Sequence, residues 1–205
     1  MPHARALAAL EELKAGNQRF VANAGRIAAT MSADHRAVLA GGQSPHAIVL
    51  GCSDSRVPAE LVFDQGLGAL FVIRVAGNIV APTQVASVEF AASRFGTRLV
   101  VVLGHSSCGA VAATLEAIQN GSGADTRNLQ SIVERIRPTI VGLTRTPLAG
   151  DPAALMREAV RANVRASANH LRHGSPLLEQ LAREDGLLVV TAEYDLERGV
   201  VEYFE

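Results

Sequence analysis

The residues best suited to chemistry are the two cysteines, Cys52 and Cys108, and His105, which lies three positions before the second of them. Each follows an apolar run closely, so the thiols and the imidazole are expected near strand ends. Two thiolates and one imidazole are a ligand set that suits zinc, and three protein ligands leave the fourth position that catalytic zinc sites use for water or substrate. The sequence offers no third cysteine for a structural site. This pattern therefore predicts a catalytic zinc site.

Each of these residues also has an ordinary structural explanation. A lone cysteine is among the most buried residue types, and a histidine at a strand end is often a hydrogen-bonded loop residue. Their joint placement beside charged residues favours the metal site over that explanation. A thiol-redox role is weaker, because the two cysteines are far apart in the sequence and lack a Cys-x-x-Cys arrangement.

A carboxylate and a guanidinium follow the first cysteine in the segment Cys52-Ser-Asp-Ser-Arg56. If the backbone is extended here, alternate side chains share a face, so Cys52, Asp54 and Arg56 point the same way. An Asp-Arg pair beside a metal ion is a recognisable outer shell of a metal site. The alternative is an ordinary ion pair or Asx-turn that closes the strand, and the neighbouring cysteines make it the weaker interpretation.

Alternating strands and helices are expected to position these residues. The expected strands are apolar runs that end in glycine or at a turn, and they span residues 46–52, 69–75, 98–104, 186–194 and 200–204. The expected helices have apolar residues at helical spacing and span residues 3–23, broken near Gly16, then 83–95, 109–119, 126–145 and 152–172, with Gly121-Ser-Gly123 stopping the third.

This order of elements predicts an α/β fold. We expect a single domain over residues 1–205, with a mostly parallel open sheet of four parallel strands plus an antiparallel C-terminal edge strand, flanked by helices. Open α/β sheets bind their ligands beyond the carboxyl ends of the strands. Cys52 and His105 lie at two such ends, so the sheet is expected to bring them together.

The bulk composition narrows the class of partner. The net charge of −1 gives no electrostatic footprint for nucleic acid or for an anionic membrane surface. Charged residues interrupt the apolar N-terminus before any signal peptide could form, and no apolar run approaches the length of a membrane span. We therefore expect a cytoplasmic protein whose partner is a small molecule or another copy of the chain.

Cys52-Ser-Asp-Ser-Arg56-Val-Pro and Gly104-His-Ser-Ser-Cys-Gly109 together resemble the paired signature of the β-carbonic anhydrases, and the likeness covers nearly the whole chain. The resemblance implies one Zn²⁺ per chain on Cys52, His105 and Cys108. Asp54 and Arg56 would form a dyad at the fourth coordination position, with Asp54 itself ligating zinc only in a closed state. Members that close under bicarbonate carry a tryptophan where this chain has Val49, so the open type is favoured.

The resemblance also implies a substrate pocket and an oligomer. Gln43 matches a glutamine that donates to a substrate oxygen, Phe71, Ala76 and Phe90 match apolar pocket positions, and the Gly109 amide faces the oxygen that gains charge. As bare residues, Gln43 would be assigned to a solvent-facing loop and the two phenylalanines to the core. The family completes this pocket across a dimer interface. We expect a dimer or dimer of dimers, with residues 1–35 as a helical arm, detached from the core, that packs on the partner.

The resemblance implies the reversible hydration of carbon dioxide to bicarbonate and a proton, by a zinc-bound hydroxide that the Asp-Arg dyad orients. Hydrolysis of carbonyl sulfide or carbon disulfide on the same scaffold is one alternative, and a non-catalytic zinc-binding dimer is another. No histidine other than His105 falls where it could be assigned as a proton shuttle. Arg74, which has a regulatory role in the closed type, is expected here to form a structural salt bridge.

Overall fold

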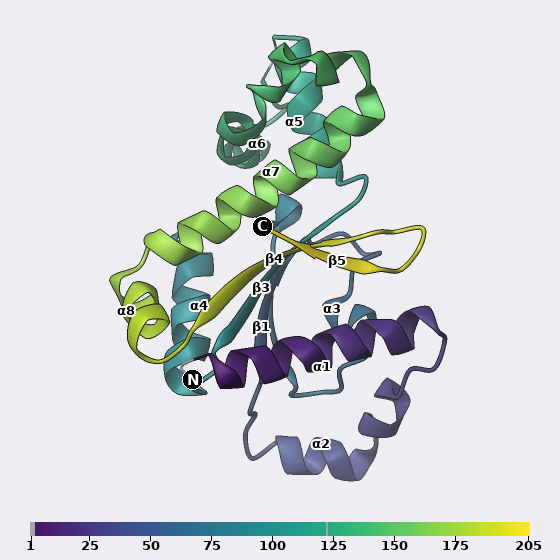
Figure 1. The fold of residues 1–205 in the computed structure, drawn as a ribbon, viewed down its shortest axis with the longest axis vertical. Helices are drawn as coiled ribbons and strands as arrows, with labels where there is room; N and C mark the ends of the chain where they lie inside the picture. The colour runs from purple at the N-terminus through teal and green to yellow at the C-terminus, as the bar shows by residue number, and fades with distance from the viewer. Residues whose placement is uncertain (1–2, 122) are drawn as a thin grey trace.

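A five-stranded sheet forms the centre of the molecule in the computed structural model, which describes residues 3–121 and 123–205 (Figure 1). Neighbouring strands follow the order β2-β1-β3-β4-β5, in which the first four run parallel and β5 runs antiparallel to β4. The strands are β1 (Ala47–Gly51), β2 (Leu70–Arg74), β3 (Leu99–His105), β4 (Leu188–Tyr194) and β5 (Val201–Phe204). The predicted sheet is confirmed.

The register of the sheet brings the carboxyl ends of β1, β2 and β3 to the same end of the sheet. Gly51, the last residue of β1, lies opposite Arg74 of β2 on one side and Leu103 of β3 on the other. Every residue of β1 and β3 is buried, as their unbroken aliphatic sequences require in a parallel sheet that is covered on both faces. Cys52 and His105 therefore meet at the same end of the sheet.

Helices cover both faces of the sheet and extend beyond its carboxyl end (Figure 1). The α1 helix crosses one face, α4, α7 and α8 cover the other, and α5 and α6 pack together beyond the strand ends. The helices are α1 (Ala4–Val21), α2 (Ala33–Leu39), α3 (Ala59–Val62), α4 (Pro82–Arg94), α5 (Gly109–Gln119), α6 (Arg127–Ile140), α7 (Pro152–His173) and α8 (Pro176–Glu184), with short 3₁₀ turns at Ile27–Thr30, Ala76–Asn78, Leu143–Arg145 and Pro147–Gly150.

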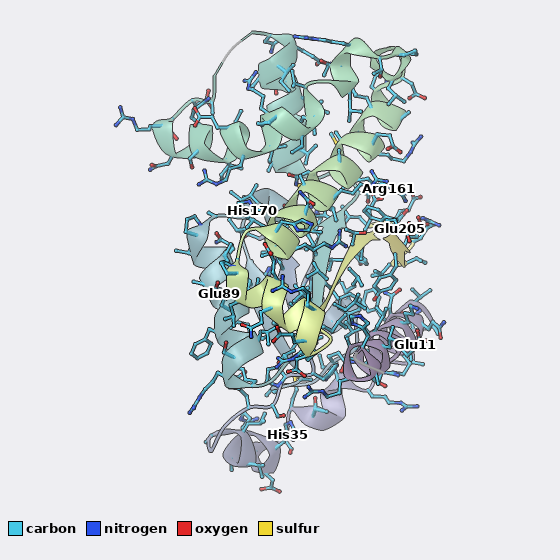
Figure 2. All side chains as sticks on the ribbon, turned by 60° about the vertical axis from the view of Figure 1, so that its left-hand side comes forward. Glu11, His35, Glu89, Arg161, His170 and Glu205 are labelled. Atoms are coloured by element: carbon cyan, nitrogen blue, oxygen red, sulfur yellow. The ribbon has the colours of Figure 1, made fainter. Side chains whose placement is uncertain are left out.

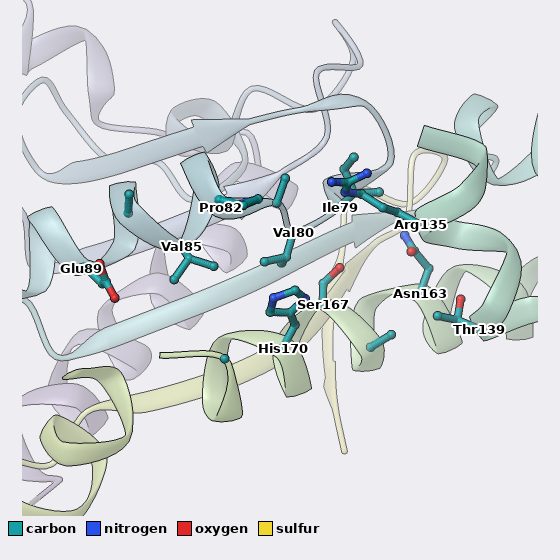
Figure 3. Close-up of a pocket in the computed structure, with 14 residues that line it drawn as sticks. Ile79, Val80, Pro82, Val85, Glu89, Arg135, Thr139, Asn163, Ser167 and His170 are labelled. Atoms are coloured by element: carbon teal, nitrogen blue, oxygen red, sulfur yellow. The ribbon is translucent and has the colours of Figure 1, made fainter. Parts of the chain in front are cut away.

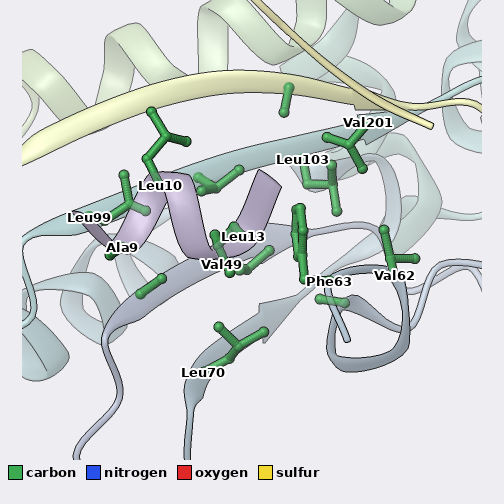
Figure 4. Close-up of a cluster of buried hydrophobic side chains, with 14 of the residues drawn as sticks. Ala9, Leu10, Leu13, Val49, Val62, Phe63, Leu70, Leu99, Leu103 and Val201 are labelled. Carbon is green, nitrogen blue, oxygen red and sulfur yellow. The ribbon is translucent and has the colours of Figure 1, made fainter. Parts of the chain in front are cut away.

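The N-terminal helix differs from its prediction in two ways. It continues without a break through Gly16. That glycine is needed for packing, because a β-carbon there would lie 1.8 Å from the carbonyl oxygen of Phe63, the residue after α3. The helix also buries Leu10 and Leu13 against the sheet of its own chain, beside Val49 and Leu103 (Figure 4). The expectation that this arm is detached from its own core is therefore wrong, and packing of the arm on a second copy stays a prediction.

Other differences concern short helices and one helix end. Helices α2, α3 and α8 were not predicted from the sequence, and the expected helix over 126–145 ends at Ile140 and is followed by 3₁₀ turns. Met1 and Pro2 of the expected 1–35 arm, and Ser122 of the expected helix stop, lie outside the described residues. Within residues 3–121 and 123–205, none of the helices combines the length and the apolar character that crossing a bilayer demands.

Candidate metal centre

The ends of two strands and the start of one helix bring Cys52, His105 and Cys108 together. Cys52 directly follows β1, His105 is the last residue of β3, and Cys108 caps the amino end of α5. All three side chains are buried, and their donor atoms lie within 4.8 Å of one another. Ser107 between the last two adopts a φ of +55°, a left-handed conformation that turns the chain sharply from β3 into α5. The three residues predicted as ligands thus converge on one point.

The His105 ring is oriented to present one nitrogen to this cluster. Its Nδ1 lies 2.9 Å from the carbonyl oxygen of Ser106, and a carbonyl only accepts, so Nδ1 carries the proton. Its Nε2 is buried and has no hydrogen-bond partner among the described residues. A buried imidazole nitrogen with a free lone pair, whose other nitrogen is held by a carbonyl, is the arrangement of a metal-ligating histidine.

The charges of the two thiols also fit a divalent cation. Contact with the Cys108 thiol, and to a lesser extent the proximity of His105, lowers the pKa of the Cys52 thiol well below its ordinary value. The same Cys52–Cys108 contact, together with burial, raises the pKa of Cys108 far above its ordinary value. The pair therefore holds one negative charge by itself, because a second thiolate would be buried against the first. A cation at this point would remove that repulsion, so the donor set fits Zn²⁺.

Asp54 and Arg56 form a tight pair next to the cluster. Arg56 donates to Asp54 from Nε at 2.9 Å, from Nη2 at 2.7 Å and from its backbone amide at 2.9 Å. These hydrogen bonds hold the pKa of the Asp54 carboxyl far below its usual range, so it is ionised at every working pH. Its Oδ2 also lies 3.8 Å from Nε2 of His105. The pair thus contains both an Asx-type turn and an ion pair, and the carboxylate faces the cluster.

Two further contacts to this region were not found by the sequence analysis. The Gly77 amide donates to Sγ of Cys52 at 3.3 Å, and Arg74 donates to the backbone carbonyl groups of Cys52 and Asp54. In the described part of the chain Arg74 has no carboxylate partner, so the expected salt bridge is wrong. The Ala76-Gly-Asn78 sequence signals a turn, but only the sheet register places it against Cys52.

Side chains of the α7 helix donate hydrogen bonds to the Ala76–Asn78 turn. Asn163 donates from Nδ2 to the carbonyl oxygen of Gly77 at 2.7 Å, and Ser167 donates to that of Asn78 at 2.9 Å. Both side chains are buried and lie four residues apart, on one face of the helix. They form part of the wall of a cavity of about 510 Å³ between α4, α6 and α7 (Figure 3). In the sequence, the signal that could have identified them is two polar residues, four positions apart, within the apolar face of the expected helix.

The expected substrate residues separate into two groups. Ala76 and Gly109 line one cavity of about 470 Å³, together with small and apolar side chains of α5 and α6 and the polar residues Glu116, Asn120 and Asp125. Phe71 and Phe90 lie elsewhere, with ring centroids 6.1 Å apart, and Phe71 pairs with Ile48 near the start of β1. Four residues of strand, roughly 13 Å, separate that level from Cys52.

Gln43 lies on the same side as the phenylalanines. It is exposed and precedes the first residue of β1, so the full length of the strand separates it from Cys52. A single chain does not bring Gln43, Phe71 or Phe90 to the Cys-His-Cys cluster. His35 of α2 is also remote, because it lies at the end of the molecule opposite α5 and α6 (Figures 1 and 2).

Comparisons with known proteins agree with this geometry. The family model for carbonic anhydrase matches residues 47–201, a segment that contains all three cluster residues and the dyad. The chain belongs to the β-class carbonic anhydrase family. It is 39% identical to carbonic anhydrase 2 of Mycobacterium tuberculosis over 201 residues, which cover 97% of this chain and 93% of that protein. It is also 39% identical to a carbonic anhydrase of Mycolicibacterium smegmatis over 204 residues, with 98% and 95% covered.

Solved structures of β-carbonic anhydrases share the fold. A tetrameric β-carbonic anhydrase of Sordaria macrospora superposes with a TM-score of 0.75 at 26% identity, covering 86% of this chain and 89% of that one. The expectations of an enzyme, of a carbonate dehydratase within the lyases and of an α/β domain are confirmed by this membership. Zinc is typical of the family, and the Cys-His-Cys cluster is the group that would bind it.

Proposed function

We propose that this chain hydrates carbon dioxide reversibly to bicarbonate and a proton, with one zinc ion per chain on Cys52, His105 and Cys108. The observation that carries the proposal is the buried cluster of these three donors, with the ionised Asp54 carboxylate 3.8 Å from Nε2 of His105. A zinc ion held there supplies a Lewis acid that activates water near neutral pH. The chain's own residues then bind the substrate, orient the attacking water and exclude bulk water.

Asp54 orients the attacking water rather than deprotonating it. Its pKa lies far below neutrality because Arg56 holds the carboxylate, so Asp54 accepts a hydrogen bond and does not take up the proton. This contact directs a lone pair of the water oxygen at the carbon of carbon dioxide. Arg56 keeps the carboxylate both charged and aimed. The proton released by the reaction leaves to solvent.

The remaining residues serve the substrate. Ala76 presents a small apolar surface to uncharged carbon dioxide, and the amide of Gly109 meets the oxygen that gains charge. Gln43, Phe71 and Phe90 would act from a second copy of the chain, since their own metal ligands are a strand length away. Phe90 is 54% exposed in the single chain, which supports burial against a partner. We therefore propose a homodimer or a dimer of dimers.

The N-terminal segment and the location of the protein belong to the same proposal. Residues 1–35 would contact the partner through the exposed side of α1, and α2, which starts at Ala33 and buries none of its residues in its own chain, would extend this contact beyond residue 35. Both cysteines are free thiols, as a zinc site requires. A reducing compartment such as the cytoplasm preserves them, so we propose a cytoplasmic enzyme.

Stopped-flow measurement of carbon dioxide hydration, from pH 6.5 to 9 on protein of known zinc content, tests the proposal. We expect fast turnover that disappears with zinc removal, a 10- to 100-fold fall in kcat/KM for Asp54→Asn, and loss of zinc from Cys108→Ser. Asp185→Asn is the matched control, because it breaks an Asp–Arg pair with Arg98 away from the cluster.

Zinc-loaded protein that is inactive across this pH range would contradict the proposal. Turnover of carbonyl sulfide or carbon disulfide by such protein would assign it to the sulfur substrates instead. Inactivity towards all three substrates would leave the non-catalytic zinc-binding dimer.

A further inference from the structure

Arg74 holds the backbone that carries both a metal ligand and the dyad carboxylate. Its Nε donates to the carbonyl oxygen of Cys52 at 3.0 Å, and its Nη2 donates to the carbonyl oxygen of Asp54 at 2.5 Å. We propose that Arg74 is a positioning residue, which fixes the Asp54 carboxylate relative to the cluster by clamping these two carbonyl groups. This inference rests on the function proposed above and adds a residue to its machinery.

The position of Arg74 in the sheet explains why a side chain is needed. Arg74 is the last residue of β2 and pairs with Gly51, the last residue of β1. The Val75 amide makes the final backbone contact, to the carbonyl oxygen of Gly51 at 3.1 Å. Beyond this point, no backbone hydrogen bond joins the two strands in the described part of the chain, so the carbonyl groups that follow Gly51 lack a partner in β2. The Arg74 side chain continues the pairing where the ladder ends.

A guanidinium suits this role better than any other side chain. The two carbonyl groups belong to residues 52 and 54, and alternate carbonyl groups of an extended segment point to the same side. Arginine presents its N–H donors in a rigid planar fork that can bind both, whereas lysine presents one compact ammonium group. The single side chain of Arg74 therefore fixes the peptide groups at both ends of the Cys52–Asp54 segment.

The clamp leaves Asp54 little freedom. Its carbonyl oxygen accepts from Arg74 and from the Val57 amide, the latter at 3.1 Å, while its carboxylate is held by Arg56. Arg56 is itself exposed, so it orients the carboxylate but does not hold the backbone beneath it. A shift of about 1 Å in a reacting geometry can cost about 100-fold in rate. Loss of the clamp would permit such a shift without removing any ligand.

Two Arg74 variants and one matched control test the inference. Arg74→Met removes the donors and keeps an apolar stem, whereas Arg74→Lys keeps the charge and one donor group. Arg172→Met is the control, because Arg172 of α7 also donates to a strand carbonyl, that of Val189 at 2.6 Å, near the amino end of β4. Arg74→Met loses two arginine–carbonyl hydrogen bonds next to the cluster, whereas Arg172→Met loses one away from it.

Three measurements separate positioning from general stability. In zinc-loaded protein we expect kcat/KM for carbon dioxide to fall 10- to 100-fold in Arg74→Met, to recover in part in Arg74→Lys, and to stay within about twofold in Arg172→Met. In metal-free protein we expect both methionine variants to lose thermal stability, with the larger loss in Arg74→Met because it loses two hydrogen bonds instead of one. In cobalt-substituted protein we expect the visible d–d spectrum to change in Arg74→Met and to match the parent spectrum in Arg172→Met.

The cobalt spectrum keeps this inference separate from the proposed function, because it requires no substrate. If the parent protein does not hydrate carbon dioxide, but Arg74→Met still changes the spectrum and Arg172→Met does not, the function fails and the clamp stands. The clamp is refuted if the spectrum of Arg74→Met equals that of Arg172→Met. It is also refuted if the rate loss only follows the loss of folded protein.

Discussion

Gly77 shows how much a single residue can contribute to the cluster. Its φ of +68° is a left-handed conformation that glycine adopts without strain, and its amide donates to Sγ of Cys52. A β-carbon there would lie 2.9 Å from Cδ1 of Ile136 and 3.0 Å from Cβ of Ala110. The residue is therefore restricted to glycine both by its backbone conformation and by the side chains packed around it.

Gly77→Ala should both destabilise the protein and weaken metal binding. Gly96→Ala is the matched control, because its φ is +67° and a β-carbon there meets nothing within 4 Å. The backbone conformation alone costs about 1–2 kcal/mol in the control, and the crowding at Gly77 adds about 1–3 kcal/mol. Urea unfolding of metal-free protein measures this difference, and chelator competition should show roughly tenfold weaker zinc binding for Gly77→Ala alone. Equal losses in both variants would show that the contacts around Gly77 are unimportant.

At the scale of elements, Asp64 joins α1 to α3 and to the segment between α1 and α2. Its carboxylate accepts from Nε of Arg19 at 2.6 Å and from the backbone amides of Arg26 and Ile27 at 2.6 and 3.0 Å. The side chain is only 2% exposed. Burial raises the pKa of Asp64, but the hydrogen bonds from Arg19 and the two amides outweigh burial and leave the pKa below its ordinary value.

Asp64→Asn should lower the free energy of unfolding by about 3 kcal/mol at pH 7, because it leaves the Arg19 charge without its buried partner. A depressed pKa in the folded state adds stability above the unfolded value of about 3.9 and loses it as the pH falls through the folded value. The difference between parent and variant should therefore shrink as the pH falls below about 4.

Urea unfolding of metal-free protein at pH 7 and pH 3 measures this change without interference from zinc release. Asp185→Asn provides the control, since the Arg98 hydrogen bond also lowers the pKa of that exposed carboxyl. Solvent screens the Asp185 pair, so this variant should lose much less stability than Asp64→Asn. A pH-independent difference for Asp64→Asn would show that the Arg19 pair does not contribute through the charge of the carboxylate.

At the scale of the whole molecule, the β2 edge of the sheet carries an aromatic surface. Phe71 of the edge strand β2, Phe90 of α4 and Phe95 lie within contact distance of one another, with ring centroids 5.7 to 6.1 Å apart. An edge strand with unpaired backbone groups beside exposed aromatic rings is a natural contact for another chain. Two residues of the expected substrate pocket are part of this surface.

Phe90→Asp should separate the oligomer and reduce activity together. We expect light scattering after gel filtration to show a shift towards the monomer mass, and kcat/KM to fall at least tenfold. Zinc content should not change, because all three ligands belong to one chain. Leu129→Asp is a control for assembly only, since Leu129 of α6 is 50% exposed and lies away from the β2 edge, in the wall of the cavity that Ala76 and Gly109 line. A fully active monomer, or an intact oligomer of Phe90→Asp, would contradict the proposed interface.

Local sequence signals were sufficient where one physical cause dominated. The apolar runs over 46–52 and 98–104 predicted β1 and β3 because only a strand covered on both faces needs so continuous an aliphatic sequence. The helices α2, α3 and α8 were missed because they have only 7, 4 and 9 residues, which is too short for an apolar repeat to identify a helix. For α1 the amphipathic pattern predicted a helix, but it could not predict which surface its apolar face would cover.

The Cys-His-Cys cluster and the neighbouring Asp–Arg pair could be proposed from residue types, because few side chains can bind zinc and their spacing is local to two strand ends. The contacts that support this cluster could not be predicted from the sequence. Arg74 is 22 positions from Cys52, Asn163 is 86 from Gly77, and Gln43 is close to Cys52 in sequence but a strand length away in space. Residue chemistry is a property of the sequence, whereas the partner of a backbone carbonyl depends on sheet register and helix packing, which only the folded chain determines.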